Sequence, residues 1–334
     1  MRAAGGHILT VDAARGAFAI GVMVYHLLYW QGIASFDRLS FYCVYAFFVI
    51  SGFALYVTYS HRLASSKELQ TYLFRRFRRI APLFYLTIAL SIWVDGAPEN
   101  FLHKLALNLT FAFGLANPGQ TSIPTGGWSI GIEMVFYLAL PLVIAACGKS
   151  LIRLSTLTLL SMACSLAFID LTLGDGETHW IAYTQPIAFG VYFTAGCLIG
   201  ELYLRMPSLK GSRSTFVLAA LALLPFVLIR ADTAVDLIVG WTGFALMTAT
   251  IVLVASTAFM PEPKGVAHTV ASWVGRISYP VYLLHPIAAG IVGRYMGLTG
   301  LWAVVVTILL TVVLSDIVNR QVEQRVARLG RVAG

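Results

Sequence analysis

Long apolar stretches separated by short polar connections dominate this chain of 334 residues. An α-helix needs about 20 mainly apolar residues to cross a membrane, and about ten stretches reach or approach that length. Charged side chains make up 11% of the chain, compared with roughly a quarter in soluble domains. The sequence therefore predicts an all-α, polytopic membrane helix bundle. The predicted spans are 11–30, 40–60, 80–95, 128–147, 151–170, 186–204, 214–230, 236–259, 272–293 and 299–319.

The basic residues fall mainly on one side of the predicted bundle. With the N-terminus in the cytoplasm, all of the 23 lysines and arginines except Arg38, Lys104, Arg230 and Arg294 lie on the cytoplasmic side. This is the positive-inside pattern of membrane proteins, and it predicts that both termini are cytoplasmic. The net charge of +8 then reflects topology, so we expect no nucleic-acid partner.

The connection 96–127 contains a moderately apolar segment, 101–116, which is short and interrupted. A crossing there would invert every later helix and spoil the charge asymmetry, so we expect an outer-surface or re-entrant helix. No Pro/Ser-rich linker or charge block divides the chain, which favours a single membrane domain over 1–334 with no C-terminal soluble domain. The spacings Gly196/Gly200 and Gly293/Gly297 permit close helix packing, although such spacings are common by chance.

Three ionisable side chains, His26, Glu133 and His285, interrupt the apolar stretches. Such groups are costly in a membrane and usually mark a functional site, with interhelical hydrogen bonding as the alternative. The helical rise places all three at a similar depth, in the outer half of the predicted bundle. We therefore expect them to converge on one site. Helical spacing adds the polar side chains that share their faces, namely Ser129, Tyr137, Ser278 and Tyr282.

Two other patterns do not indicate a catalytic or metal site. Gly127, Ser129 and Gly131 match the G-x-S-x-G nucleophile motif, but that motif requires a strand–turn–helix and here it opens a predicted membrane helix. We interpret Ser129 as a capping or site-lining hydroxyl. The cysteines lack metal-ligand spacing and an extracellular pairing pattern, so we read them as small hydrophobic residues and expect no metal. They are Cys43, Cys147, Cys164 and Cys197.

Arginines gather at the predicted inner ends of the helices. Arg15 precedes His26 by eleven residues, which places both on one helical face about 16 Å apart. Guanidinium groups suit phosphate recognition, although topology and attraction to anionic lipid also explain a basic cluster. Together with the deeper ionisable groups, they predict a ligand with phosphates at the inner face and a long arm, which is the shape of acyl-CoA. The predicted donor-binding residues are Arg15, Arg75, Arg76, Arg79 and Arg276.

Several segments resemble signatures of the bacterial acyltransferase family 3, whose members acylate sugars of surface glycans. Arg15 and His26 match its Arg, ten residues, His pattern. FFVISGF at 47–53, RRFRRIAPLFY at 75–85, GGWSIGIEMVFYLALP at 126–141 and GRISYPVYLLHP at 275–286 follow in the usual order. Family members often carry a second acidic residue after the one matched by Glu133, but this chain has Met134, which excludes adjacent carboxylates.

The resemblance implies a multi-pass enzyme of the bacterial inner membrane. It would move an acyl group, typically acetyl, from acyl-CoA (acetyl-CoA) to a hydroxyl of a carbohydrate or glycolipid. On this hypothesis His26 is the general base, Glu133 orients it, and Tyr282 or His285 stabilises the oxyanion. Direct transfer is favoured because no activated nucleophile is evident, while an acyl-histidine intermediate stays open.

Other readings remain. We expect the acceptor from the outer side, and a cytoplasmic acceptor is the competing arrangement. A glycan transporter or exporter with a His/Glu proton relay is the main alternative function, although the internal repeats typical of such carriers are not evident. A third reading is a structural partner in a glycan-assembly complex.

Overall fold

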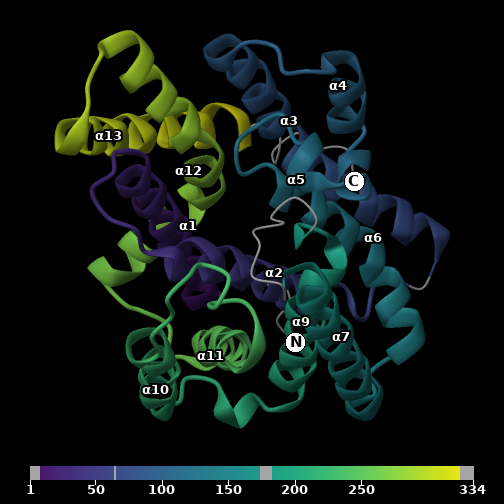
Figure 1. Cartoon of the computed structure of the whole chain (residues 1–334). Coiled ribbons are helices and arrows are strands. Elements are labelled where there is room, and N and C mark those ends of the chain that lie inside the picture. Colours follow the sequence, from purple (N-terminus) through teal and green to yellow (C-terminus); the bar gives the residue numbers. More distant parts are fainter. Residues whose placement is uncertain (1–7, 64, 174–182, 324–334) are drawn as a thin grey trace.

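The computed structural model describes residues 8–63, 65–173 and 183–323, and this part of the chain is helical without a strand (Figure 1). The long helices are α1 (Leu9–Trp30), α2 (Asp37–Tyr59), α3 (Ser66–Asp95), α6 (Trp128–Cys147), α7 (Leu151–Leu173), α9 (Pro186–Arg205), α10 (Ser214–Leu228), α11 (Gly240–Phe259), α12 (Val266–Met296) and α13 (Gly300–Val318). The short elements are α4 (Phe101–Leu109), η1 (Ala112–Gly114), α5 (Pro118–Thr121), η2 (Pro207–Leu209) and η3 (Asn319–Glu323).

Each predicted apolar span forms one of these long helices. Within the described residues, 8 helices are long and apolar enough to cross a membrane. The other two are α10, which is short at 15 residues, and α12, which has 31 residues but carries polar and charged groups along its length. The structure confirms a polytopic helical bundle. The count of ten crossings and the cytoplasmic placement of both termini stay predictions.

Helix α12 lies between α1 and α13, and α1 in turn packs against α2. The contact between α1 and α12 depends on two glycines. A Cβ on Gly16 would lie 2.6 Å from a backbone oxygen of α12, and one on Gly275 would lie 2.9 Å from a backbone oxygen of α1. Only glycine permits so close an approach. The two helices run in the same direction from this contact, which brings His26 and His285 to the same level.

The predicted small-residue pair in α9, Gly196 and Gly200, packs against α2. A Cβ on Gly196 would lie 2.1 Å from the carbonyl oxygen of Val49 on α2, and one on Gly200 would also touch α2. The spacing in α12 has a different role. A Cβ on Gly293 would have no heavy atom within 4 Å, and Gly297 follows α12 with a φ of +64°. The first pair therefore packs two helices, whereas Gly297 terminates one.

Segment 101–116 divides into α4 and η1, and the longer of these, α4, has 9 residues. At 1.5 Å per residue it extends about 14 Å, less than half the hydrocarbon thickness. The rings of Phe111 and Phe113 pack on Phe84 of α3 at 5.1 and 5.5 Å. Buried Asn108 bonds the backbone of α4, of α5 and of the turn that follows. The segment thus folds back beside the middle of α3 and is too short for a full crossing, while its outer-surface or re-entrant placement stays a prediction.

Candidate active site

His26 of α1 and His285 of α12 form a hydrogen-bonded pair, which we call the histidine dyad. Nδ1 of His26 lies 2.9 Å from Nε2 of His285, and the two rings are nearly parallel, with 13° between their planes. Nδ1 of His285 lies 3.1 Å from the carbonyl oxygen of Val281. A carbonyl only accepts, so in the neutral ring Nδ1 of His285 carries the proton and Nε2 is an acceptor. His26 therefore donates from Nδ1, which leaves the lone pair of its own Nε2 available.

Aromatic rings hold the dyad in place from two sides. Trp30, one turn after His26 on α1, stacks on the His26 ring with centroids 5.0 Å apart and 3° between the planes. Tyr282, just under one turn before His285 on α12, has its ring centroid 6.2 Å from that of His285. His285 is 1% exposed, whereas His26 is half-buried. His26, the predicted base, is thus the more accessible member of the pair, and its orientation is fixed by packing as well as by hydrogen bonding.

The hydroxyl of Tyr282 lies in a small network with the start of α6. It donates to the carbonyl of Gly126 at 3.0 Å and lies 2.8 Å from Oγ of Ser129, which also reaches that carbonyl at 3.1 Å. Ser129 can donate to the Gly126 carbonyl by itself. The Tyr282 hydroxyl can therefore rotate and donate to a ligand without leaving that carbonyl unpaired. Ser129 has no base among these partners, which suits a lining hydroxyl and gives no support for a nucleophile.

A cavity of about 310 Å³ extends from Tyr282 to the end of the bundle where α1 begins. We call it the arginine cavity, and its polar lining includes Arg15, Arg76, Arg79, Ser129, Glu133 and Tyr282. Arg15 is held by its Nε, which donates to Oγ of Ser278 at 3.0 Å. Nε of Arg76 is buried and has no hydrogen-bond partner within the described part of the chain. Nη2 of Arg76 donates to the Tyr59 hydroxyl at 3.1 Å, so the Nε–H is the unpaired donor. A buried N–H without a partner beside a cavity is a feature expected of an anion site.

Glu133 lies in this cavity and takes a different role from the predicted one. Its carboxylate accepts a hydrogen bond from Tyr137 at 2.5 Å and one from Ser51 at 3.3 Å. The sequence hypothesis that Glu133 orients His26 is therefore corrected, because His285 makes that contact. His285 is also corrected as an oxyanion donor, since both of its ring nitrogens are already engaged. Tyr282 remains the candidate oxyanion donor.

The predicted arginine set is also divided by the structure. Arg76 and Arg79, which are three residues apart on α3, both line the arginine cavity, whereas exposed Arg75 does not. Exposed Arg276 donates to Ser272 of its own helix at 2.5 Å and lies outside the cavity lining. Arg75 and Arg276 therefore lie outside the lining of this candidate donor cavity. Sequence clustering showed that these residues are close along the chain, not which of them reach the interior.

A second cavity, of about 260 Å³, lies at the end of the bundle where α1 finishes. We call it the tryptophan cavity, and its polar and aromatic lining includes Trp30, Gln31, Asp95 and Thr125. Through Trp30 it approaches the dyad from the side opposite to the arginine cavity. These residues carry no distinctive sequence signal, because a Trp at a helix end is typical of the membrane interface and an Asp at a helix end is typical of a loop.

The family model described as an acyltransferase domain, that of acyltransferase family 3, matches residues 8–320. The chain belongs to acyltransferase family 3. It is also 25% identical over 290 residues to "Putative acetyltransferase ORF330" of Acidianus two-tailed virus, a match that covers 85% of this chain and 84% of that protein. No solved structure matches the chain. These findings confirm the resemblance seen in the sequence and establish an acyl-transferring membrane enzyme.

Membership of acyltransferase family 3 gives the dyad a chemical context. Acyl transfer from an activated donor to a hydroxyl needs a base, a donor for the oxyanion and two binding regions that meet at the base. The family match includes α1 and α12, and thus both histidines. It ranks acyl transfer above the transporter and structural-partner readings.

Proposed function

We propose that this acyltransferase moves a short acyl group, acetyl in the first instance, from acyl-CoA in the arginine cavity to a carbohydrate hydroxyl in the tryptophan cavity. The observation that carries the proposal is the position of the dyad, one helical turn or less from residues that line each cavity. The arginine end would face the cytoplasm of a bacterial cell, where acyl-CoA is available, and the enzyme would reside in the inner membrane.

The donor side depends on guanidinium groups. Arg15, Arg76 and Arg79 line one cavity, and such groups bind phosphate oxygens through paired hydrogen bonds. The rise of α1 from Arg15 to His26 is about 16 Å, which is the span that the pantetheine arm of coenzyme A must cover. Glu133 lies in the same cavity, where its carboxylate limits the net positive charge and discriminates among anions.

The acceptor side suits a sugar. Trp30 offers an aromatic ring, and Gln31, Asp95 and Thr125 offer hydrogen-bonding groups around a cavity that is open to the other end of the bundle. Carbohydrates present both hydroxyls and apolar C–H faces, and aromatic rings with convergent polar groups recognise both. An exopolysaccharide, an O-antigen or a glycolipid carries such a hydroxyl, and membrane lipid would surround the bundle.

The proposed transfer needs one proton relay. Nε2 of His26 removes the proton of the acceptor hydroxyl as the hydroxyl oxygen attacks the thioester carbon. The charged His26 ring is stabilised because its Nδ1–H donates to Nε2 of His285. Tyr282 donates to the carbonyl oxygen, which carries the negative charge of the tetrahedral intermediate. The C–S bond then breaks, and the leaving thiolate takes the proton from His26. The products are an ester and coenzyme A, with no net change in the enzyme.

Donor binding is tested with two arginine variants that differ by one position. Protein reconstituted in lipid nanodiscs is titrated with radiolabelled acetyl-CoA. Loss of a charge-assisted hydrogen bond costs about 1.5–3 kcal/mol, so Arg76→Ala is expected to weaken binding roughly 10- to 150-fold. Arg75→Ala, which removes an equal charge outside the cavity, is expected to change affinity less than about twofold. Equal weakening in both variants would mean that the cavity is not the donor site.

Transfer itself is tested in membranes that contain endogenous glycans. The wild-type protein should pass label from acetyl-CoA to a glycan fraction, and His26→Ala should lower that rate about 100- to 10,000-fold while acetyl-CoA binding persists. Retained transfer in His26→Ala would exclude His26 as the base. Flux of a glycan driven by a pH gradient, with no label incorporated, would instead favour the transporter.

A further inference from the structure

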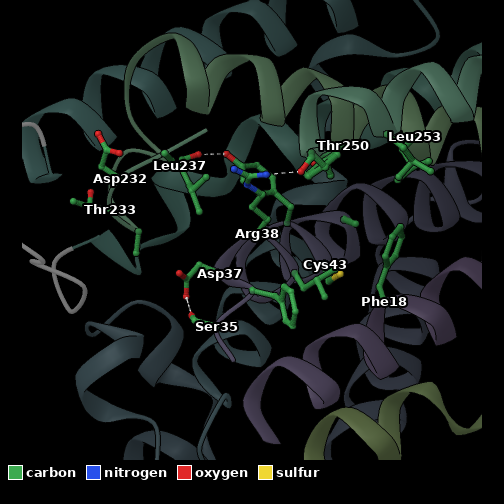
Figure 2. A pocket seen from close by; sticks show the side chains of 18 residues that line it. Phe18, Ser35, Asp37, Arg38, Cys43, Asp232, Thr233, Leu237, Thr250 and Leu253 are labelled. Atoms are coloured by element: carbon green, nitrogen blue, oxygen red, sulfur yellow. Dashed lines mark hydrogen bonds between the residues drawn. The ribbon is translucent and has the colours of Figure 1, made fainter. Parts of the chain in front are cut away.

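A third cavity, of about 500 Å³, lies outside the candidate active site, between α2, α10 and α11. Figure 2 shows Phe18, Cys43 and Leu253 toward one end of it and Asp232 and Thr233 toward the other. The end near Phe18 is apolar, whereas the far end carries carboxylate and hydroxyl groups. Neither the dyad nor any residue assigned above to the donor or acceptor lines this cavity.

Two phenylalanines lie between this third cavity and the arginine cavity. Phe18 of α1 lines the third cavity and Phe47 of α2 lines the arginine cavity. Their rings pack edge to face, with centroids 6.5 Å apart and 88° between the planes. Phe47 also packs edge to face on Tyr282, with centroids 5.6 Å apart. The pair therefore forms an aromatic wall that borders the proposed reaction centre on one side and an apolar space on the other.

We propose that the Phe18–Phe47 wall restricts the donor to short acyl chains. The inference rests on the proposed function, in which the thioester carbonyl lies beside Tyr282. The three substituents of a carbonyl carbon point in different directions in one plane. Its sulfur leads to the arginine cavity and its oxygen meets Tyr282, so the acyl chain takes the third direction. Phe47 borders both the arginine cavity and Tyr282, and it stands where that chain must extend.

The packing explains the selectivity. A methyl group fits against the face or edge of a ring, but a longer chain must displace Phe47 and then Phe18, and well-packed interiors resist such insertion. Beyond the two rings, the apolar end of the third cavity offers room for several methylene groups. Each methylene moved from water to an apolar site improves affinity about fourfold, so opening the wall should convert a penalty for long chains into a gain.

The experiment compares a wall variant with a matched control. The double variant Phe18→Ala/Phe47→Ala opens the wall. The control Phe226→Ala also removes a phenyl ring, but from another side of the third cavity. Acetyl-, butanoyl- and hexanoyl-CoA compete with radiolabelled acetyl-CoA for protein in nanodiscs. For the wild type and Phe226→Ala, we expect hexanoyl-CoA to bind at least about tenfold more weakly than acetyl-CoA. For the double variant, we expect it to bind at least as tightly as acetyl-CoA.

The outcomes separate this inference from the proposed function. Wild-type protein that binds none of the acyl-CoA compounds would refute the proposed donor. Wild-type protein that binds acetyl- and hexanoyl-CoA equally would refute the proposed selectivity of the wall but leave the proposed donor intact. The wall is also refuted if the double variant binds acetyl-CoA but still rejects hexanoyl-CoA, or if Phe226→Ala gains as much. Should the double variant fail to fold, Phe18→Leu/Phe47→Leu retains apolar packing and is expected to gain affinity for butanoyl-CoA, and no gain there would overturn the inference.

Discussion

In the proposed mechanism His285 positions the base His26, and this role predicts a measurable loss of turnover when His285 is replaced. Its Nε2 accepts from Nδ1 of His26 at 2.9 Å, and its own Nδ1 donates to a backbone carbonyl at 3.1 Å. Without this acceptor, Nδ1–H of His26 is left unpaired when the ring takes up a proton. A hydrogen bond to a charged group is worth about 1.5–3 kcal/mol, so His285→Leu should lower kcat roughly 10- to 150-fold.

Two variants of similar size isolate the hydrogen bond from packing. Leu fills much of the space of the imidazole without an acceptor, whereas Gln supplies an amide oxygen that can accept from His26. His285→Gln should therefore retain more activity than His285→Leu. The affinity for acetyl-CoA should stay the same in both variants, because His285 does not line the arginine cavity. The assay measures acetyl transfer to membrane glycans and acetyl-CoA binding on the same preparations.

A double-mutant cycle decides whether His285 acts through His26. If it does, His26→Ala/His285→Leu should be no slower than His26→Ala alone, because residues that act as a unit lose their effect together. Turnover of His285→Leu within about twofold of the wild type would contradict the reasoning. Losses that multiply in the double variant would show that His285 contributes independently of His26.

Two further predictions concern folding and pH. Gly196→Ala would place a Cβ 2.1 Å from a backbone oxygen of α2, so we expect less folded protein in membranes. The control Gly293→Ala, whose Cβ would have no heavy atom within 4 Å, should express normally. Size-exclusion profiles of the two variants test this. Burial raises the pKa of Glu262, in the connection between α11 and α12, above its ordinary value. The neutral carboxyl is then favoured in the folded state, so its stabilising effect is full below the ordinary pKa and is lost as pH rises through the raised one. Gln stays neutral at all pH values, so Glu262→Gln should not lose stability as pH rises and should have a higher Tm than the wild type at neutral pH. Equal Tm values for the two proteins across the pH range would refute this prediction.

The helices were predictable from sequence because the membrane demands long apolar segments with closed backbone hydrogen bonds. The level of the site was predictable for a similar reason. Helical rise alone placed His26 and His285 at one depth, and the structure brings their ring nitrogens to 2.9 Å. Rise along a helix says nothing about rotation around its axis. Depth alone therefore could not exclude Glu133 as the predicted partner of His26, but Glu133 bonds Tyr137 and Ser51 instead.

A buried carboxylate does not by itself mark a functional site, as Glu201 shows. Glu201 of α9 is 3% exposed, accepts from Tyr56 at 3.1 Å and pairs with Arg205 at 2.5 Å. Its partners are complete and it lines none of the three cavities described above. Its polar contacts link α9 to α2, which is a structural role. The dyad differs because, within the described residues, the lone pair of His26 Nε2 has no such partner.

The pairing of the proposed base, His26, with a second imidazole follows from the membrane setting. A histidine paired with a carboxylate would bury a negative charge beside the reaction centre, and a buried charge is costly unless it is fully paired. Two neutral imidazoles and a backbone carbonyl give the same directed chain of hydrogen bonds without a resting charge. The carboxylate of Glu133 lies instead among the guanidinium groups of the arginine cavity, where opposite charges offset its burial. The glycine contact at Gly16 and Gly275 therefore does more than pack two helices, since it sets the register that makes a neutral dyad available as a base.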